Sequence, residues 1–306
     1  MNQKLNLNPW WVTGFSDAEG SFNMSIFKSK TAAIGWTIEP CFIITLHERD
    51  LELLNSIKNF FSVGSVSIVG KDARFRVRSR SELKVIITHF NKYPLQTTKA
   101  LNFAYFCEIL SLINNKVHTN VPGFLKLASL INRLNKPLSE SLLTKLVELG
   151  PLPKIEFETS SSLNISNKVQ ILNPWWISGF ATGEGSFTYF TRTRVNSEGK
   201  TVKDYSLVFE ISQRTQDLHI LNLIVSYFNV GNVYTETSGI SRYRLGTKDK
   251  IINKLIPHFN NYSLAGYKYL QYSAWLKIVY LLNDQVRTDQ RDIELEKLVK
   301  ELSSLK

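Results

Sequence analysis

Residues 9–22 read Pro9-Trp-Trp-Val-Thr-Gly-Phe-Ser-Asp-Ala-Glu-Gly-Ser-Phe22, and residues 174–187 read Pro174-Trp-Trp-Ile-Ser-Gly-Phe-Ala-Thr-Gly-Glu-Gly-Ser-Phe187. Nine of these fourteen positions are identical, and corresponding residues lie 165 positions apart, as Glu19 and Glu184 do. Chance does not produce such agreement within one chain. The sequence therefore contains an internal duplication, and each half is expected to fold in the same way.

Each copy has the pattern of a helix that packs closely against another helix. An Asn-Pro pair opens it, which supplies a capping side chain and a residue suited to the first turn. Small residues then recur four apart, at Gly14 and Ala18 in the first copy and at Gly179 and Gly183 in the second. A glycine inside a helix costs roughly 1 kcal/mol relative to alanine. We therefore expect the two helices to pack backbone against backbone along this stripe.

Each predicted helix ends in a glutamate, Glu19 or Glu184. The C-terminus of a helix is unfavourable for an acid, because the macrodipole is negative there. Two carboxylates brought together at such ends would repel one another, and a bound divalent cation would remove that cost because hard cations prefer carboxylate oxygens. The alternative is that each glutamate only faces solvent. Both acids persist while neighbouring positions differ, which favours the metal site.

The segments from Val12 to Gly20 and from Ile177 to Gly185 resemble the two motifs of a single-chain LAGLIDADG homing endonuclease, most similar to those encoded in fungal mitochondrial introns. The resemblance implies an α+β fold of two pseudo-symmetric αββαββα domains. Their antiparallel four-stranded sheets would form a DNA-binding saddle, with the paired motif helices at the interface. It also implies a monomer that hydrolyses one phosphodiester on each strand of a long, nearly non-palindromic duplex site and leaves short 3′ overhangs.

In the family the acid just before the final glycine of the motif binds metal. Thr182 stands where the first motif has Asp17, which argues that Asp17 is not catalytic. The resemblance implies Mg²⁺ as the cofactor, with Mn²⁺ as a substitute and Ca²⁺ supporting DNA binding without cleavage. The metal ligands expected from it are the carboxylates of Glu19 and Glu184 and the main-chain carbonyls of Ala18 and Gly183.

The composition suits a nucleic-acid partner. The 306 residues include 37 Lys and Arg against 26 Asp and Glu, a net charge of +11, which favours a polyanionic ligand. No apolar run approaches the roughly 18 residues of a membrane span, so we expect no membrane association. Residues 1–7 show neither a signal peptide nor a transit peptide. We expect an organelle-encoded protein of the mitochondrial matrix.

Hydrophobic periodicity predicts the order α-β-β-α-β-β-α in each half. We expect residues 1–149 and 169–306 to form the two LAGLIDADG domains, joined by a linker at 150–168. Further helix is expected within 115–146. In the first half two strands are expected within 21–46, helix over 47–61, a hairpin from 63 that turns at Gly70 and returns over 74–80, and helices over 81–90 and 99–112. In the second half strands are expected over 187–194, 207–212 and 242–248, with helix over 216–228.

Polar residues alternate with apolar residues along several predicted strands, which points to polar sheet faces that contact DNA bases and phosphates. The segment from Arg74 to Arg80 places four arginines on one face, and the alternative is a solvated edge strand. The expected DNA contacts are Ser21, Asn23, Ser25, Arg74, Arg76, Arg78, Arg80, Ser186, Thr188, Arg192, Arg194, Arg242, Arg244 and Lys248.

The alignment of the two halves matches Lys99 with Lys268 at predicted helix starts, where a positive charge is locally unfavourable. The family uses a lysine and a polar residue around the attacking water, so these lysines are candidate catalytic residues; solvated lysines are the alternative. Gln213 resembles the water-positioning residue, and its counterpart is Leu46. His89 and His258 also match, and we expect both to be structural.

Three functions compete on this pattern. A site-specific endonuclease on double-stranded DNA accounts for both glutamates. An RNA-binding maturase with intron RNA as its ligand would share the fold, and a DNA-binding regulator would use the scaffold without catalysis. An unrelated basic α+β protein with a duplicated core explains neither the acids nor the lysines. Retention of both Glu19 and Glu184 favours the endonuclease.

Overall fold

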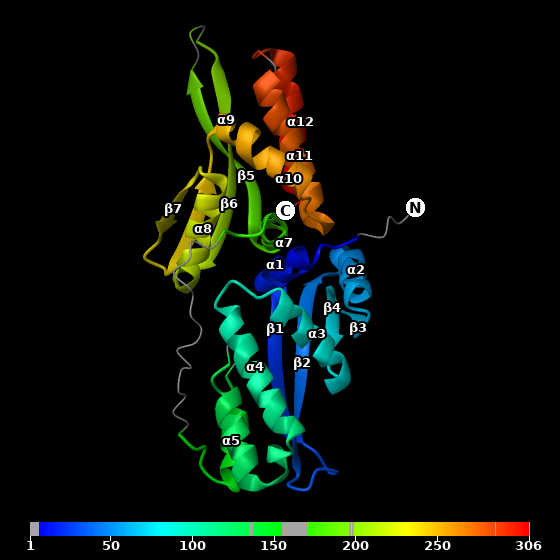
Figure 1. The fold of residues 1–306 in the computed structure, drawn as a ribbon. Coiled ribbons are helices and arrows are strands. Elements are labelled where there is room, and N and C mark those ends of the chain that lie inside the picture. The colour runs from blue at the N-terminus through cyan, green and yellow to red at the C-terminus, as the bar shows by residue number, and fades with distance from the viewer. Residues whose placement is uncertain are drawn as a thin grey trace. The chain divides into compact units, whose positions relative to one another are not determined.

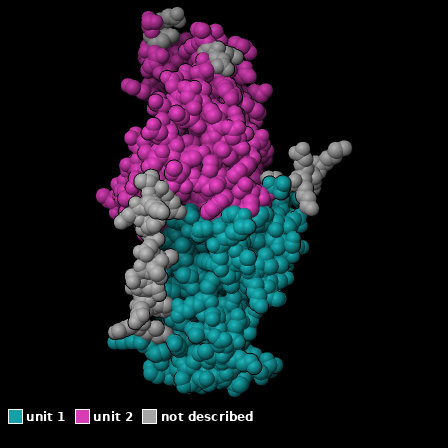
Figure 2. Space-filling model, in the orientation of Figure 1, with its two compact units in different colours: residues 1–6, 19–169 teal, residues 7–18, 170–306 magenta. Residues whose placement is uncertain are grey.

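The computed structural model describes residues 6–134, 137–154, 171–195, 197, 199–284 and 286–305. The chain divides into two compact units (Figure 2). One comprises Met1–Asn6 and Glu19–Val169, and the other comprises Leu7–Ala18 and Gln170–Lys306. The predicted linker lies largely at 155–168, outside the described residues.

The first unit is built on a four-stranded antiparallel sheet of order β1-β2-β4-β3, covered by helices (Figure 1). Its strands are β1 (Gly20–Lys28), β2 (Trp36–His47), β3 (Ser65–Val69) and β4 (Asp72–Val77). Its helices are α2 (Leu51–Phe61), α3 (Arg80–Lys92), α4 (Lys99–Asn114), α5 (Val121–Ile131) and α6 (Glu140–Leu146), with 3-10 turns at Glu48–Asp50, Val117–Thr119 and Val147–Leu149.

The second unit repeats this sheet in the order β5-β6-β8-β7, and it also contains most of the first motif helix. Its strands are β5 (Gly185–Val195), β6 (Thr201–Arg214), β7 (Asn232–Thr235) and β8 (Ile240–Leu245). Its helices are α1 (Pro9–Glu19, as far as Ala18), α7 (Pro174–Glu184), α8 (Leu218–Phe228), α9 (Lys248–Lys250), α10 (Ile256–Asn261), α11 (Gly266–Asp284) and α12 (Asp289–Ser304), with a 3-10 turn at Thr215–Asp217 and a π-turn at Ile251–Leu255.

The predicted α+β class and the repeated αββαββα order are confirmed. The strand register repeats as well, since Gly20 pairs with Ile44 in the first sheet and Gly185 pairs with Ile211 in the second. Strands β5 and β6 are longer than predicted. The helix expected over 47–61 begins only at Leu51, because His47 ends β2 and its ring accepts a hydrogen bond from the amide of Arg49 at 3.2 Å.

Each sheet buries one face beneath its helices. Along β1 the buried residues Phe22, Met24 and Ile26 alternate with partly or fully exposed polar residues. The ring of Phe22 packs against the ring of Phe42 in a tilted arrangement, at a centroid distance of 5.1 Å. Burying a side chain of this size contributes about 1.5–3 kcal/mol. The alternation thus fixes which face of the sheet remains available to a ligand.

The second core has the same arrangement around Phe187 and Phe209, whose ring centroids are 5.0 Å apart. Helix α11 is fixed onto β5 by the indole of Trp275, which donates to the carbonyl of Thr188 at 2.9 Å. In the described part of the chain, no helix combines the length and apolarity needed to cross a membrane.

His258 lies in this core within a closed hydrogen-bond network. Ser178 Oγ donates to the carbonyl of Tyr262 at 2.6 Å, so at 3.0 Å it accepts from His258 Nε2. His258 Nδ1 then accepts from the hydroxyl of Tyr227 at 3.0 Å. Burial lowers the pKa of His258 to about 3 and that of His89, which lies among aromatic rings in the first core, to about 4. Both imidazoles are therefore neutral and structural at neutral pH.

We expect the free energy of unfolding to fall as the pH is lowered from 7.5 to 5. An unfolded histidine takes up a proton near pH 6.5, whereas folded His258 takes one up only near pH 3. Between these values the unfolded state binds more protons, so the stability present above pH 6.5 is lost progressively towards pH 3. Denaturant unfolding at three pH values would measure the slope.

A His258→Phe variant should flatten this slope, while His219→Gln, at an exposed position of α8, should leave it unchanged. Equal slopes for wild type and His258→Phe would contradict the prediction.

Candidate active site

Helices α1 and α7 contact each other backbone to backbone within the second unit. A Cβ atom added at Gly14 would lie 2.0 Å from the carbonyl oxygen of Trp176, and one added at Gly179 would lie 2.0 Å from that of Trp11. The two contacts exchange equivalent residues of the two motifs, so the helix pair has a local two-fold relation. The close packing predicted from the glycine positions is confirmed. Both predicted caps also form, since the amides of Trp10 and Trp175 each donate at 2.9 Å to the preceding Asn side chain.

The pair is not fully symmetric, because the motifs differ at Asp17 and Thr182. The buried carboxylate of Asp17 accepts a hydrogen bond from the indole of Trp176 at 2.8 Å, across the helix contact. Thr182 instead donates to the carbonyl of Ser178 in its own helix at 2.8 Å. Asp17 is thus engaged in helix packing.

Glu19 and Glu184 are the last residues of α1 and α7, and both side chains are half-buried. A buried glycine follows each of them and opens β1 or β5. At Gly185 an added Cβ would lie 2.4 Å from the carbonyl oxygen of Ala181, so the turn after Glu184 has no room for a side chain. Each helix end therefore presents hard oxygen donors, a carboxylate and main-chain carbonyls, as a divalent cation requires.

The two candidate lysines lie near these turns, each within its own unit. Lys268, near the start of α11, donates its ammonium group to the carbonyl of Gly185, directly after Glu184. Lys99, the first residue of α4, lines a cavity of about 390 Å³ together with Gly20, directly after Glu19. Of the two lysines that repeat alignment identified, Lys268 contacts the residue that follows a motif glutamate, and Lys99 lines the same cavity as the corresponding residue of the first half.

Gln213 lies on β6, two residues beyond Ile211, which pairs with Gly185. Leu46 holds the same place in the first sheet, two residues beyond Ile44, which pairs with Gly20. The predicted correspondence is therefore repeated in the strand register. One half carries an amide at this place and the other an aliphatic side chain.

The polar face of the first sheet contains Ser21, Asn23 and Ser25 on β1, with Arg74 and Arg76 on β4. Arg74 pairs with Asp72 at 3.1 Å, and Arg76 donates to Ser67 on β3 at 2.9 Å. These side chains alternate with buried residues as predicted.

The prediction that four arginines share one strand face is wrong. Strand β4 ends at Val77, so Arg78 lies beyond it, and Arg80 begins helix α3. Arg78 pairs with Glu39 of β2 at 2.9 Å. The strand ends early because Ser79 precedes a helix, and a period of two cannot show where a strand gives way to a helix.

In the second sheet Ser186, Thr188, Arg192 and Arg194 lie on β5, and Arg242 and Arg244 lie on β8. Arg242 is held by two carboxylates, Glu236 at 2.7 Å and Glu210 at 2.8 Å. The hydrogen bond from Arg242 lowers the pKa of Glu236. The guanidinium of Arg244 lies 4.5 Å from the ring centroid of Phe190, a cation–π contact.

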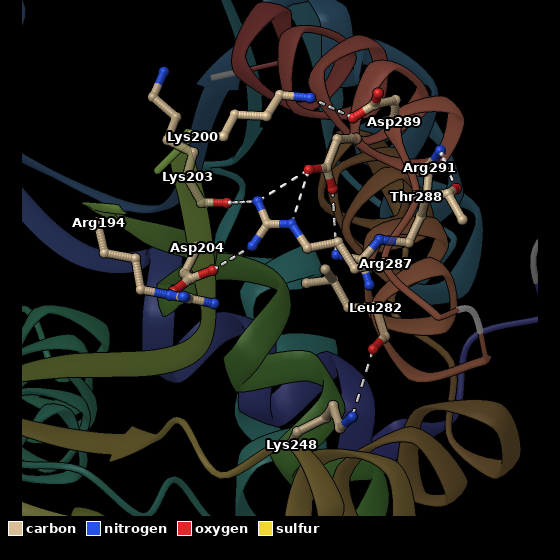
Figure 3. Close-up of polar contacts among 11 residues, drawn as sticks. Arg194, Lys200, Lys203, Asp204, Lys248, Leu282, Arg287, Thr288, Asp289 and Arg291 are labelled. Atoms are coloured by element: carbon tan, nitrogen blue, oxygen red, sulfur yellow. Dashed lines mark hydrogen bonds and ion pairs between the residues drawn. The ribbon is translucent and has the colours of Figure 1, made fainter. Parts of the chain in front are cut away.

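Lys248 is a second correction to the predicted strands. Strand β8 ends at Leu245, and Lys248 begins the short helix α9, where its ammonium group lies 3.5 Å from the carbonyl of Leu282 (Figure 3).

Sequence reasoning missed the acids that form ion pairs with the arginines predicted to contact DNA. An alternating pattern does contain the signal for some of them, since Glu210 lies between buried Phe209 and Ile211 and so shares a face with Arg242. Which arginine each acid pairs with depends on cross-strand register, which the pattern does not give. The acids are Glu39, Asp72, Asp204, Glu210 and Glu236.

Glu19 and Glu184 are the acids at the ends of the two motif helices. Across the residues the structure describes, no group of three or more His, Cys, Asp or Glu side chains could hold a metal ion.

The sequence profile described as LAGLIDADG endonuclease matches residues 12–110 and 177–279, more than half of the chain and one match in each repeat. The chain therefore belongs to the LAGLIDADG endonuclease family. Over 286 residues it is 32% identical to "Probable intron-encoded endonuclease 3" of Neurospora crassa, covering 92% of this chain and 51% of that protein. It is 30% identical to "Probable intron-encoded endonuclease 2" of the same fungus, covering 98% of this chain and 65% of that one. The chain thus spans about half to two thirds of these relatives.

Among solved structures the chain is similar to I-SmaMI, described as bound to uncleaved DNA target in the presence of calcium ions. The identity is 32% and the TM-score 0.84, with 97% of this chain and 99% of that chain covered. The two repeated domains and their paired sheets are therefore those of a single-chain LAGLIDADG homing endonuclease fold.

We expect Gly14→Ala and Gly179→Ala each to destabilise the protein by about 1–3 kcal/mol, because the added Cβ meets a backbone carbonyl that cannot rotate away. Gly246→Ala is the control, since its Cβ would meet only ordinary contacts from 3.4 Å. Denaturant unfolding would measure all three. Equal stability of Gly14→Ala and Gly246→Ala would show that the helix contact is looser than described.

Proposed function

We propose that this chain is a site-specific endonuclease that recognises a long, nearly non-palindromic duplex DNA site and cuts one phosphodiester on each strand, leaving short 3′ overhangs. One observation carries the proposal. Two motif helices pack reciprocally through Gly14 and Gly179, and each ends in a half-buried glutamate that leads into a sheet with a cationic polar face. A duplex has approximate two-fold symmetry, so a duplicated protein suits it.

Membership of the LAGLIDADG endonuclease family and similarity to a DNA-bound structure support a double-stranded DNA ligand. The net charge of +11 supports the same partner. The named relatives are fungal and intron-encoded, which supports a mitochondrial site of action.

The carboxylates of Glu19 and Glu184, with the carbonyls of Ala18 and Gly183, are the proposed ligands of Mg²⁺, for which Mn²⁺ would substitute. Bound divalent cations would lower the pKa of a coordinated water and stabilise charge on the phosphate and the leaving oxygen. These donors suit such an ion, because all of them are hard oxygen atoms at helix C-termini, where the helix macrodipole is negative.

Lys99 and Lys268 are proposed to stabilise negative charge around the attacking water in their respective halves. The contact of Lys268 with Gly185 keeps its ammonium group beside the turn that follows Glu184, so it reaches the site without a large rearrangement. Gln213 is proposed to orient the water in the same half through its amide. The strand arginines and hydroxyls are proposed to contact bases and phosphates.

We expect Glu19→Gln and Glu184→Gln each to lower cleavage of both strands by at least about 100-fold, since loss of one acid removes a ligand worth several kcal/mol of transition-state stabilisation. A selection on a random duplex library with Mg²⁺ would first define the site. Cleavage and binding of that site would then be measured with Mg²⁺ and with Ca²⁺.

The matched control is Glu52→Gln on α2, which removes an exposed acid and should cut normally. Binding in Ca²⁺ should survive in both active-site variants. Specific binding by wild type without any cutting would overturn the endonuclease proposal, and intron RNA would then be the ligand to test.

The two DNA strands should be cut at unequal rates, because Gln213 serves one half while Leu46 stands in its place in the other. A time course on a supercoiled plasmid should show a nicked intermediate, always nicked on the same strand. Gln213→Leu should slow the faster cut by about 10- to 100-fold and reduce the asymmetry. Simultaneous cutting of both strands by the wild type would refute the assignment.

A further inference from the structure

The hairpin of β5 and β6 extends beyond the four-stranded sheet. Its two strands stay paired as far as Val195 and Thr201, whereas β8 pairs with β6 only from Phe209 to Arg214. Residues 201–208 of β6 therefore have a strand neighbour on one side alone. A two-stranded ribbon is marginally stable by itself, and yet this one carries Arg192 and Arg194, two proposed DNA contacts. Something besides the sheet must hold it.

Arg287, in the connection between α11 and α12, contacts two residues of β6, Lys203 and Asp204, in the part of the strand that, within the described chain, has no strand neighbour on its second side (Figure 3). Its guanidinium donates from Nη1 to the carboxylate of Asp204 at 2.7 Å and from Nη2 to the carbonyl of Lys203 at 2.9 Å. Its Nε donates to Asp292 of α12 at 2.9 Å. All three nitrogens are used at once, which the single ammonium group of a lysine could not reproduce. The edge of β6 is thereby joined to α12.

Asp204 links this contact to the DNA face. One of its carboxylate oxygens accepts from Arg287, and the other accepts from Nε of Arg194 on the neighbouring strand. The two arginines lower the pKa of Asp204, so the carboxylate is ionised at neutral pH. Arg194 is half-exposed, while Arg287 is more buried, with 29% of its side chain exposed. The more exposed of the two arginines is thus the proposed DNA contact, Arg194.

A second ion pair joins the same two elements, from Lys200 at the start of the hairpin's return to Asp289 in the first turn of α12, at 2.7 Å. Isolated pairs at a surface contribute little, but a network of shared charges with a fixed guanidinium fork restricts geometry. In the corresponding hairpin of the first unit, buried Trp36 of β2 meets Phe124 of α5 at a centroid distance of 6.4 Å, and exposed Lys28 of β1 pairs with Glu148 at 3.6 Å. Neither of these two contacts of the first hairpin involves a guanidinium fork like that of Arg287.

We propose that Arg287 is a positioning residue for DNA recognition: through Asp204 it holds Arg194, and it thereby sets sequence discrimination at the outer end of the DNA half-site read by the second sheet. The inference rests on the proposed function, because it requires a specific duplex site. When Arg194 turns to DNA, Asp204 keeps Arg287 as its partner, so no carboxylate is left unpaired. Without Arg287, Asp204 binds Arg194 alone, and of these two ion-pair links between the ribbon and α12 only the exposed pair of Lys200 with Asp289 remains.

The test compares base preferences at every position of the selected site for wild type, Arg287→Met and Lys277→Met. Binding selections with Ca²⁺ as the divalent cation would be used. Lys277→Met is the matched control, since it also removes one positive charge and one ion pair to α12, the 2.8 Å contact with Glu301, but does not touch the hairpin. Arg287→Met should lose about fivefold or more in discrimination at outer positions of one half-site, with central positions unchanged.

Arg287→Lys serves as the second variant, because it retains the charge but not the three-way contact. It should resemble Arg287→Met, and hydrogen exchange of residues 201–208 should be faster in both. Wild-type preferences in Arg287→Met, or the same change in Lys277→Met, would overturn the inference while leaving the endonuclease proposal intact. Absence of any sequence-specific DNA binding by wild type would overturn both.

Discussion

The close contact between the backbones of α1 and α7 is the constraint on which the candidate site depends. With Gly14 against Trp176 and Gly179 against Trp11, the helices approach until neither position has room for a Cβ atom. Such a contact holds two helices in one register, since a shift along the axis would bring side chains into the backbone of the partner. The duplication of the motif then makes the register reciprocal. Glycine's unfavourable helix propensity is the cost of that arrangement.

The short turns that follow the motif helices connect the helix contact to the candidate site residues. Glu184 ends α7, the following Gly185 admits no side chain against Ala181, and Lys268 is tied to the carbonyl of Gly185. A carboxylate, a tight turn and an ammonium group are therefore placed by main-chain geometry and one hydrogen bond. The first unit repeats the order in sequence, with Glu19 followed by Gly20, and Gly20 and Lys99 line one cavity. Departures from symmetry occur at side chains, as at Asp17 and Gln213, and leave the backbone frame unchanged.

Sequence predicted what depends on local pattern and on repetition. Spacing that recurs in both halves predicted the motif helices, their caps and the αββαββα order. The same spacing showed that Lys99 and Lys268 occupy equivalent positions in the two repeats. Sequence-based prediction was wrong at several boundaries between strands and helices. Arg80 continues the alternating sequence pattern of β4, but in the structure it begins α3. The alternation of polar and apolar residues does not indicate where a strand ends. The partners of the arginines depend on register and on helices distant in sequence, as with Arg287 and Asp204.

The carboxylates beside the strand arginines change how the charge of +11 should be understood. Free arginines on a sheet face would bind any polyanion, and such binding is strong but does not distinguish sequences. In the proposed DNA complex Arg242, held between Glu210 and Glu236, and Arg74, beside Asp72, would exchange a carboxylate for a phosphate or a base. That exchange would reduce the binding free energy gained from non-specific contacts. A net gain in binding free energy would remain only where the DNA offers a well-placed hydrogen-bond acceptor. On the proposed DNA-binding faces, such acids would favour sequence discrimination over affinity. The effect would be greatest where a second partner fixes the orientation of the arginine.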